Sequence, residues 1–201
     1  MKIASTLIMI ATVAIGFSFA SNHSEATDSM VSAGGNETLW DKFTPQNVTI
    51  NVGESVTWRN PMAVSEPHSV TYVPDPEYFA PFLAPFSISN STKLKSLLPN
   101  PNIEPNVIEL NGTRAVIVDN SRSTMPVAID SGGNATYLPI NSKYTMDGSE
   151  KYVNSGWMWP QGQSPPGAPP ISNFSITFEK SGTYSYLCSV HPWMTGTVTV
   201  S

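Results

Sequence analysis

The C-terminal part of the chain alternates apolar and polar side chains, and this pattern limits the possible folds more than any other feature. The alternation runs over residues 174–178 and, after a Gly-containing turn at 180–182, again over 184–188. A final alternating stretch follows at 196–200. Successive side chains of a strand point to opposite faces, so each stretch predicts a half-buried strand. Short strands joined by tight turns indicate an antiparallel sandwich or barrel.

The first half of the domain repeats this pattern. Residues 47–52, 55–58 and 68–73 are further predicted strands, and Gly53-Glu54 predicts a turn between the first two. Only 12% of the residues are charged, while the chain has 18 Pro and 13 Gly. This composition favours strands and turns over long amphipathic helices, so an all-β fold is expected.

The N-terminus predicts an export signal over residues 1–20. Lys2 precedes an apolar stretch from Ile3 to Phe19, and Ser18-Phe19-Ala20 offers a cleavage site. An uncleaved membrane anchor is the alternative, because the stretch approaches the length of a membrane span. In that case the protein would associate peripherally with a membrane. The small polar residues 21–38 predict a flexible linker, and 39–201 a single folded domain.

A less regular insertion is expected within this domain, at about residues 74–152. Residues 107–110 and 113–118 flank Asn111-Gly112, the preferred two-residue loop of a β-hairpin. A second hairpin is predicted to turn at 131–134. The insertion is therefore expected to contain extra hairpins.

Glycosylation sequons support export to an extracellular or periplasm-like space. Such sequons occur on surface loops of secreted chains, although a chain rich in Asn, Ser and Thr contains some by chance. They lie at Asn22, Asn36, Asn47, Asn90, Asn111, Asn134 and Asn173. The formal net charge of −5 provides no basic surface for a nucleic acid, so no such partner is expected.

The single cysteine is unusual for an exported chain, because cysteines outside the cell normally occur in disulfide pairs. Cys188, His191 and Met194 follow the spacing C-x2-H-x2-M at the end of one predicted strand and in the loop after it. A thiolate and an imidazole, with a second imidazole and a weak axial thioether, are the donors of an electron-transfer copper site. His68 is the expected second imidazole, because the only other histidine, His23, lies in the predicted linker.

Each of these residues also has an ordinary interpretation when taken alone. Cys188 would be a small buried apolar residue, His191 a surface loop residue and Met194 part of the core. The C-x2-H-x2-M spacing of the three residues, together with Pro67-His68 before a predicted strand, favours a metal site over these ordinary interpretations.

The sequence resembles the plastocyanin/amicyanin group of the cupredoxins, including archaeal plastocyanin-like proteins, over residues 40–73 and 153–201. The matching positions are Phe43-Thr44-Pro45, Val48-Thr49-Ile50, Val52 to Trp58, Pro67 to Val70, Phe178, Gly182 to Cys188, His191 to Met194, Gly196, Val198 and Val200. The resemblance implies a Greek-key β-sandwich, one type 1 copper ion and transfer of single electrons. It does not account for the insertion.

The resemblance also implies roles for residues around the ligands. The backbone N–H of Ser69 is expected to donate to the sulfur of Cys188. Val190 stands where the family carries Pro, so its N–H is a second expected donor. Electrons are expected to pass through the edge of His191, with Pro192 and Trp193 forming the docking surface for protein redox partners.

Three other functions compete with an electron carrier. A copper enzyme of the oxidase or nitrite reductase type needs additional His-rich centres, which three histidines in the whole chain do not supply. The chain is therefore expected not to be an enzyme, although it would serve as an accessory electron donor to one. A copper-delivery protein would favour exchangeable Met and His ligands, and an adhesion protein would not need the ligand set.

Overall fold

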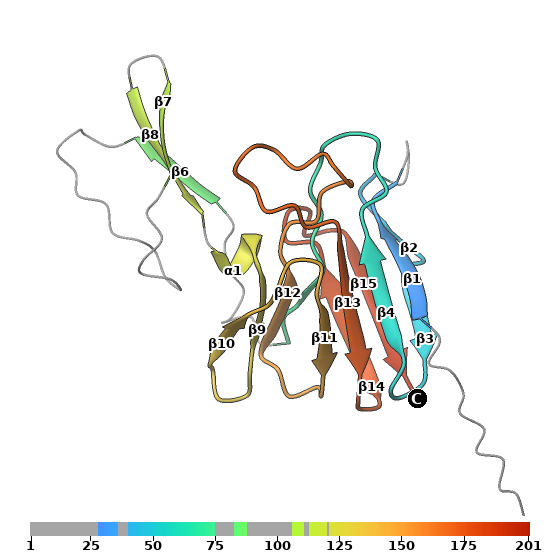
Figure 1. Ribbon diagram of the computed structural model, residues 1–201. Coiled ribbons are helices and arrows are strands. Elements are labelled where there is room, and N and C mark those ends of the chain that lie inside the picture. Colours follow the sequence, from blue (N-terminus) through green and yellow to red (C-terminus); the bar gives the residue numbers. More distant parts are fainter. Residues whose placement is uncertain (1–27, 36–39, 75–82, 88–105, 111–112, 120) are drawn as a thin grey trace, which may run out of the picture.

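A computed structural model describes residues 28–35, 40–74, 83–87, 106–110, 113–119 and 121–201 of the chain (Figure 1). The predicted signal at 1–20 lies outside these residues. Strands dominate the described part, and α1 (Ser121–Thr124) is a single helical turn within it. None of the helices there is long and apolar enough to cross a membrane. The predicted all-β class is confirmed.

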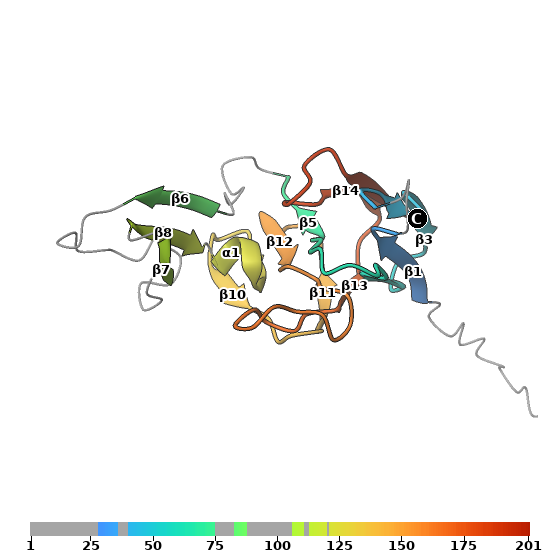
Figure 2. The ribbon, with the colours of Figure 1, turned by 90° about the horizontal axis from the view of Figure 1, so that it is seen from above.

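Two mixed sheets pack face to face as a sandwich (Figures 1 and 2). One sheet has the order β2 (Phe43–Thr44), β1 (Asp28–Ala33), β4 (Ser55–Arg59), β13 (Asn173–Phe178) and β11 (Lys143–Met146), here taken from the β2 edge. The other has the order β3 (Asn47–Ile50), β15 (Thr195–Val200), β14 (Gly182–Leu187), β5 (Thr71–Tyr72), β12 (Tyr152–Ser155), β9 (Pro126–Ile129) and β10 (Ala135–Tyr137). Early and late strands are neighbours in both sheets, as in a Greek-key sandwich rather than a meander.

The apolar residues of the alternating strands form the core of this sandwich. Phe174, Ile176 and Phe178 of β13 are fully buried, and the residues between them are partly exposed. Trp58 of β4 packs against Tyr186 of β14, with ring centroids 5.3 Å apart. Aromatic contacts of this kind join the two sheets, because such rings bury large apolar areas and favour edge-to-face geometry.

The predicted flexible linker is wrong over residues 28–33, which form β1. This strand lies between β2 and β4, and its Val31 and Ala33 are fully buried. Only these two apolar side chains mark its inner face, and the small polar residues around them resemble a linker in sequence. Pairing with β4 and β2 supplies the backbone hydrogen bonds that stabilise it.

Much of the predicted insertion extends the sandwich. β9 and β10 continue one sheet beyond β12, while β11 borders the other. Both predicted hairpins are present, as β7 (Asn106–Leu110) with β8 (Thr113–Asp119), and as β9 with β10. β6 (Leu83–Ser87), β8 and β7 form a separate three-stranded sheet (Figure 1).

Gly196 leaves room for the ring of Tyr186, which packs against Trp58 of the other sheet. A Cβ atom added at Gly196 would overlap the ring of Tyr186 on the neighbouring strand β14. We therefore expect Gly196→Ala to lower the free energy of unfolding by about 1–3 kcal/mol through overpacking. Chemical denaturation of the two proteins measures this difference.

The matched control for this variant is Gly132→Ala in the exposed β9–β10 turn, where a Cβ would meet only the ends of the Asp130 and Asn134 side chains. Both substitutions change the unfolded chain equally. Equal stabilities of the two variants would contradict the role given to the Tyr186 contact.

Candidate metal centre

The end of β14 places Cys188 at the start of a short closed loop. The N–H of Cys188 donates to the carbonyl of Met194 at 2.9 Å, and the N–H of Met194 donates to the carbonyl of His191 at 2.8 Å. These bonds turn the chain back into β15. They hold the side chains of Cys188 and His191 on the same side of the loop, where the Cys188 sulfur lies 3.7 Å from Nδ1 of His191.

His68 reaches the same place from the neighbouring strand. The predicted strand over 68–73 is shorter in the structure, because only Thr71–Tyr72 pairs as β5. His68 instead forms an isolated bridge with Met158, with two backbone hydrogen bonds of 3.0 and 2.7 Å. Because Thr71 pairs with Leu187 of β14, His68 lies beside Cys188 although the two are 120 residues apart.

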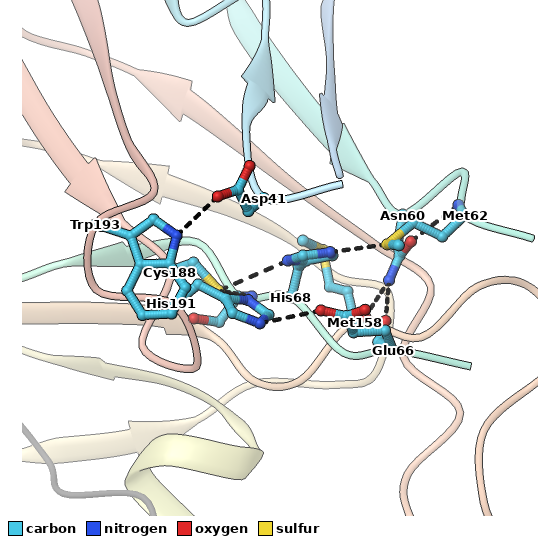
Figure 3. A network of polar contacts seen from close by, with 10 residues as sticks. Asp41, Asn60, Met62, Glu66, His68, Met158, Cys188, His191 and Trp193 are labelled. Carbon is cyan, nitrogen blue, oxygen red and sulfur yellow. Dashed lines mark hydrogen bonds and ion pairs between the residues drawn. The ribbon is translucent and has the colours of Figure 1, made fainter. Parts of the chain in front are cut away.

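The three side chains converge with geometry suited to one metal ion (Figure 3). The Cys188 sulfur lies 3.9 Å from Nδ1 of His68 as well as 3.7 Å from Nδ1 of His191. Metal bonds of about 2.0–2.3 Å in a trigonal arrangement hold sulfur and nitrogen roughly 3.7 Å apart. The donor atoms of all three residues lie within 4.8 Å of one another, and all three residues are buried. This group fits one copper ion.

Burial disfavours the charged forms of Cys188 and His68. It raises the pKa of the Cys188 thiol, and hydrogen bonds from the backbone N–H groups of Ser69, His191 and Val190 act against this shift. Burial also lowers the pKa of His68 to about 4, with His191 adding to the shift and Asp41 opposing it. The neutral imidazole of His68 and a thiol that ionises beside a cation are donors that suit a divalent metal.

Ser69 connects the two segments that carry the donors. Its backbone N–H donates to the Cys188 sulfur, with 3.3 Å between nitrogen and sulfur. Its hydroxyl accepts a hydrogen bond from the N–H of Ser189 at 2.8 Å and lies 3.0 Å from the hydroxyl of Thr71. These buried contacts fix the distance between the His68 segment and the Cys188 loop.

Met194 is buried in the loop and contributes to the core. Pro192 and Trp193 are exposed at the turn of the loop, and 63% of the Trp193 surface is accessible. The Trp193 ring lies 5.4 Å from the His191 ring, and its indole N–H donates to Asp41 at 3.0 Å. The structure therefore places every predicted site residue in or beside this loop.

Several residues around the site have no clear signal in the sequence. The imidazole Nε2 of His191 lies 3.0 Å from the Glu66 carboxylate, and that of His68 lies 3.0 Å from the Met62 sulfur (Figure 3). The Trp40 ring contacts the His191 ring edge-on at 5.6 Å. The position of Glu66 two residues before His68 was the one available hint, and Met62 and Trp40 offered none.

Comparison with known proteins finds similar solved structures. No protein-family model and no curated protein matches the chain. A reduced amicyanin variant is 16% identical with a TM-score of 0.37, over 87% of this chain and 82% of that one. A purple cupredoxin from Nitrosopumilus maritimus is 20% identical with a TM-score of 0.33, over 87% of this chain and 100% of that one.

This chain is similar to the cupredoxins. A copper-containing nitrite reductase from Thermus scotoductus is also similar, at 15% identity and a TM-score of 0.35, although the match covers only 22% of that chain. The chemistry of the site follows from its own donor atoms, the Cys188 sulfur and Nδ1 of His68 and of His191.

Gly34 offers a test of how closely the structure packs on His68. Gly34 has a φ of +81°, and a Cβ there would lie 2.5 Å from Nε2 of His68 and 2.8 Å from the Met62 sulfur. We expect Gly34→Ala to displace the imidazole and to weaken Co(II) binding by roughly tenfold or more. Titration of the metal-free protein with Co(II), followed by its visible absorption, measures this effect.

The control for this variant is Gly53→Ala. Gly53 has a similar φ of +87° but open space around its Cα, so it carries the same backbone strain without touching His68. If both variants bound Co(II) equally well, the contact between Gly34 and His68 would have no role in metal binding.

Proposed function

We propose that this protein binds one type 1 copper ion and carries single electrons between protein redox partners. The observation that carries the proposal is the buried convergence of the Cys188 sulfur with Nδ1 of His68 and of His191. A copper ion bound there would alternate between Cu(I) and Cu(II). Met194 is the proposed weak axial ligand, because it closes the same loop and is buried in it.

The residues around the donors suit transfer of an electron more than a reaction on a substrate. The bridge between His68 and Met158 and the Ser69 contacts hold the donors in a fixed arrangement, which limits rearrangement between oxidation states. The chain has three histidines in all, too few for the additional copper centres of a multicopper enzyme. The site would also suit a protein that donates electrons to such an enzyme.

The His191 edge is the proposed route for the electron. Trp193 and Trp40 flank the imidazole, and both are exposed, to 63% and 40%. Together with Pro192 they offer an apolar docking surface of the kind that suits weak and fast encounters. Copper delivery is the second candidate, and the fully buried Cys188 argues against it because an exchangeable site needs access.

Export is part of the proposal. The N-terminal apolar stretch and the sequons support it, and the Asn47 and Asn134 sequons are exposed in the structure. An extracellular or periplasm-like location, with glycans at exposed sequons, follows from this proposal. Mass spectrometry of the protein isolated from its native host would detect both cleavage after Ala20 and attached sugars.

The copper site is tested by its spectrum. We expect residues 21–201 with Cu(II) to show an intense blue or purple charge-transfer band and a narrow copper hyperfine splitting, because a Cys188 thiolate bound to copper produces both. Cys188→Ala should lose the band and the narrow splitting. Visible absorption and electron paramagnetic resonance measure these properties, and ordinary Cu(II) signals from the unmodified protein would refute the proposal.

The hydrogen bond from Val190 is tested by the reduction potential. The backbone N–H of Val190 acts to lower the pKa of the Cys188 thiol, and the sulfur bears more negative charge when copper is reduced. Val190→Pro removes this donor, so we expect a lower reduction potential by cyclic voltammetry. Val190→Ala keeps the N–H and serves as the control. A potential for Val190→Pro at or above that of Val190→Ala would contradict this role.

A further inference from the structure

One loop, running from Asn60 to Pro67, contacts the outer nitrogen of both histidines. Glu66 places a carboxylate oxygen 3.0 Å from Nε2 of His191, and Met62 places its sulfur 3.0 Å from Nε2 of His68. In both rings Nδ1 faces the Cys188 sulfur and Nε2 faces this loop (Figure 3). The loop therefore lies against the site on the side away from the cysteine.

Buried Asn60 holds this loop in place. Its side-chain amide donates to the carbonyl of Glu66 at 2.7 Å and to the carbonyl of Met158 at 2.9 Å. Its side-chain oxygen accepts a hydrogen bond from the N–H of Met62 at 3.1 Å. Because Met158 is also bridged to His68, Asn60 ties both Glu66 and Met62 to the histidine segment. The position of Glu66 thus depends on buried hydrogen bonds and not only on its own side chain.

The chemistry of Glu66 determines which nitrogen of His191 is free. A neutral imidazole has one N–H, and the ring nitrogen without hydrogen is the one that binds a metal. A carboxylate only accepts hydrogen bonds, so the 3.0 Å contact places the N–H on Nε2. The lone pair of His191 then lies on Nδ1, which faces the sulfur of Cys188.

We propose that Glu66 is a positioning residue for the metal centre, which holds His191 in the tautomer that binds metal and lowers the reduction potential of the bound copper. The second part rests on the proposed function. The side chains of His191 and Glu66 are only 11% and 30% exposed, so solvent screens their interaction incompletely. A negative charge on the outer side of the ligand stabilises Cu(II) more than Cu(I).

Two variants separate the hydrogen bond of Glu66 from its charge. Glu66→Gln keeps an oxygen that accepts from Nε2 but removes the charge, whereas Glu66→Ala removes both. The exposed Glu179, which follows β13, supplies the control Glu179→Gln with the same change in net charge.

The tautomer of His191 is measured in the metal-free protein by nitrogen-15 NMR of the histidine rings. We expect the proton on Nε2 in the unmodified protein and in Glu66→Gln, and a mixture of tautomers in Glu66→Ala. An unchanged His191 spectrum in Glu66→Ala would overturn the positioning role. This measurement uses no copper, so it stands even if the protein fails to form a blue site.

The electronic effect is measured by voltammetry of the copper-loaded variants and by Co(II) titration. We expect Glu66→Gln to raise the reduction potential clearly more than Glu179→Gln does. Glu66→Ala should weaken Co(II) binding by about 10- to 100-fold. Equal potentials for the two Gln variants would overturn the electronic role, whereas an unmodified protein without a type 1 spectrum would overturn the proposed function itself.

Discussion

The antiparallel pairing of β14 with β5 is the contact on which the site depends. It sets Leu187 opposite Thr71 and so brings Cys188 beside His68, although 120 residues separate them. The pairing lies in the interior of the seven-stranded sheet, where neighbouring strands and the aromatic core resist a change of register. A shift of one residue would turn Cys188 to the opposite face, away from His68.

Burial of Cys188 makes ionisation of its thiol unfavourable, and the surrounding residues offset only part of this cost. Three backbone N–H groups contribute to this offset. A bound cation would supply the remaining stabilisation, so metal binding and ionisation of the thiol would be coupled. The loop from Asn60 to Pro67 acts from the other side of the histidines, through Glu66 and Met62.

The candidate donors were predictable because copper sites need particular atoms at short spacing. A lone cysteine with His191 and Met194 in one loop left His68 as the only other histidine outside the N-terminal segment. The inner faces of β13 and β15 were equally clear from their alternation. β1 was missed because its inner face carries only Val31 and Ala33, a pattern too short to differ from a polar linker.

The sequence alone determined the class of fold and the candidate donors. The fold class follows from the period of the side chains, and the donors follow from the spacing of Cys188 and His191 and from the small number of histidines. The tertiary structure alone decided which groups surround the donors. Glu66 and Met62 reach the histidines because Asn60 anchors their loop, and Trp40 contacts His191 from the separate segment that precedes β2. Such contacts depend on long-range packing, which no spacing along the chain specifies.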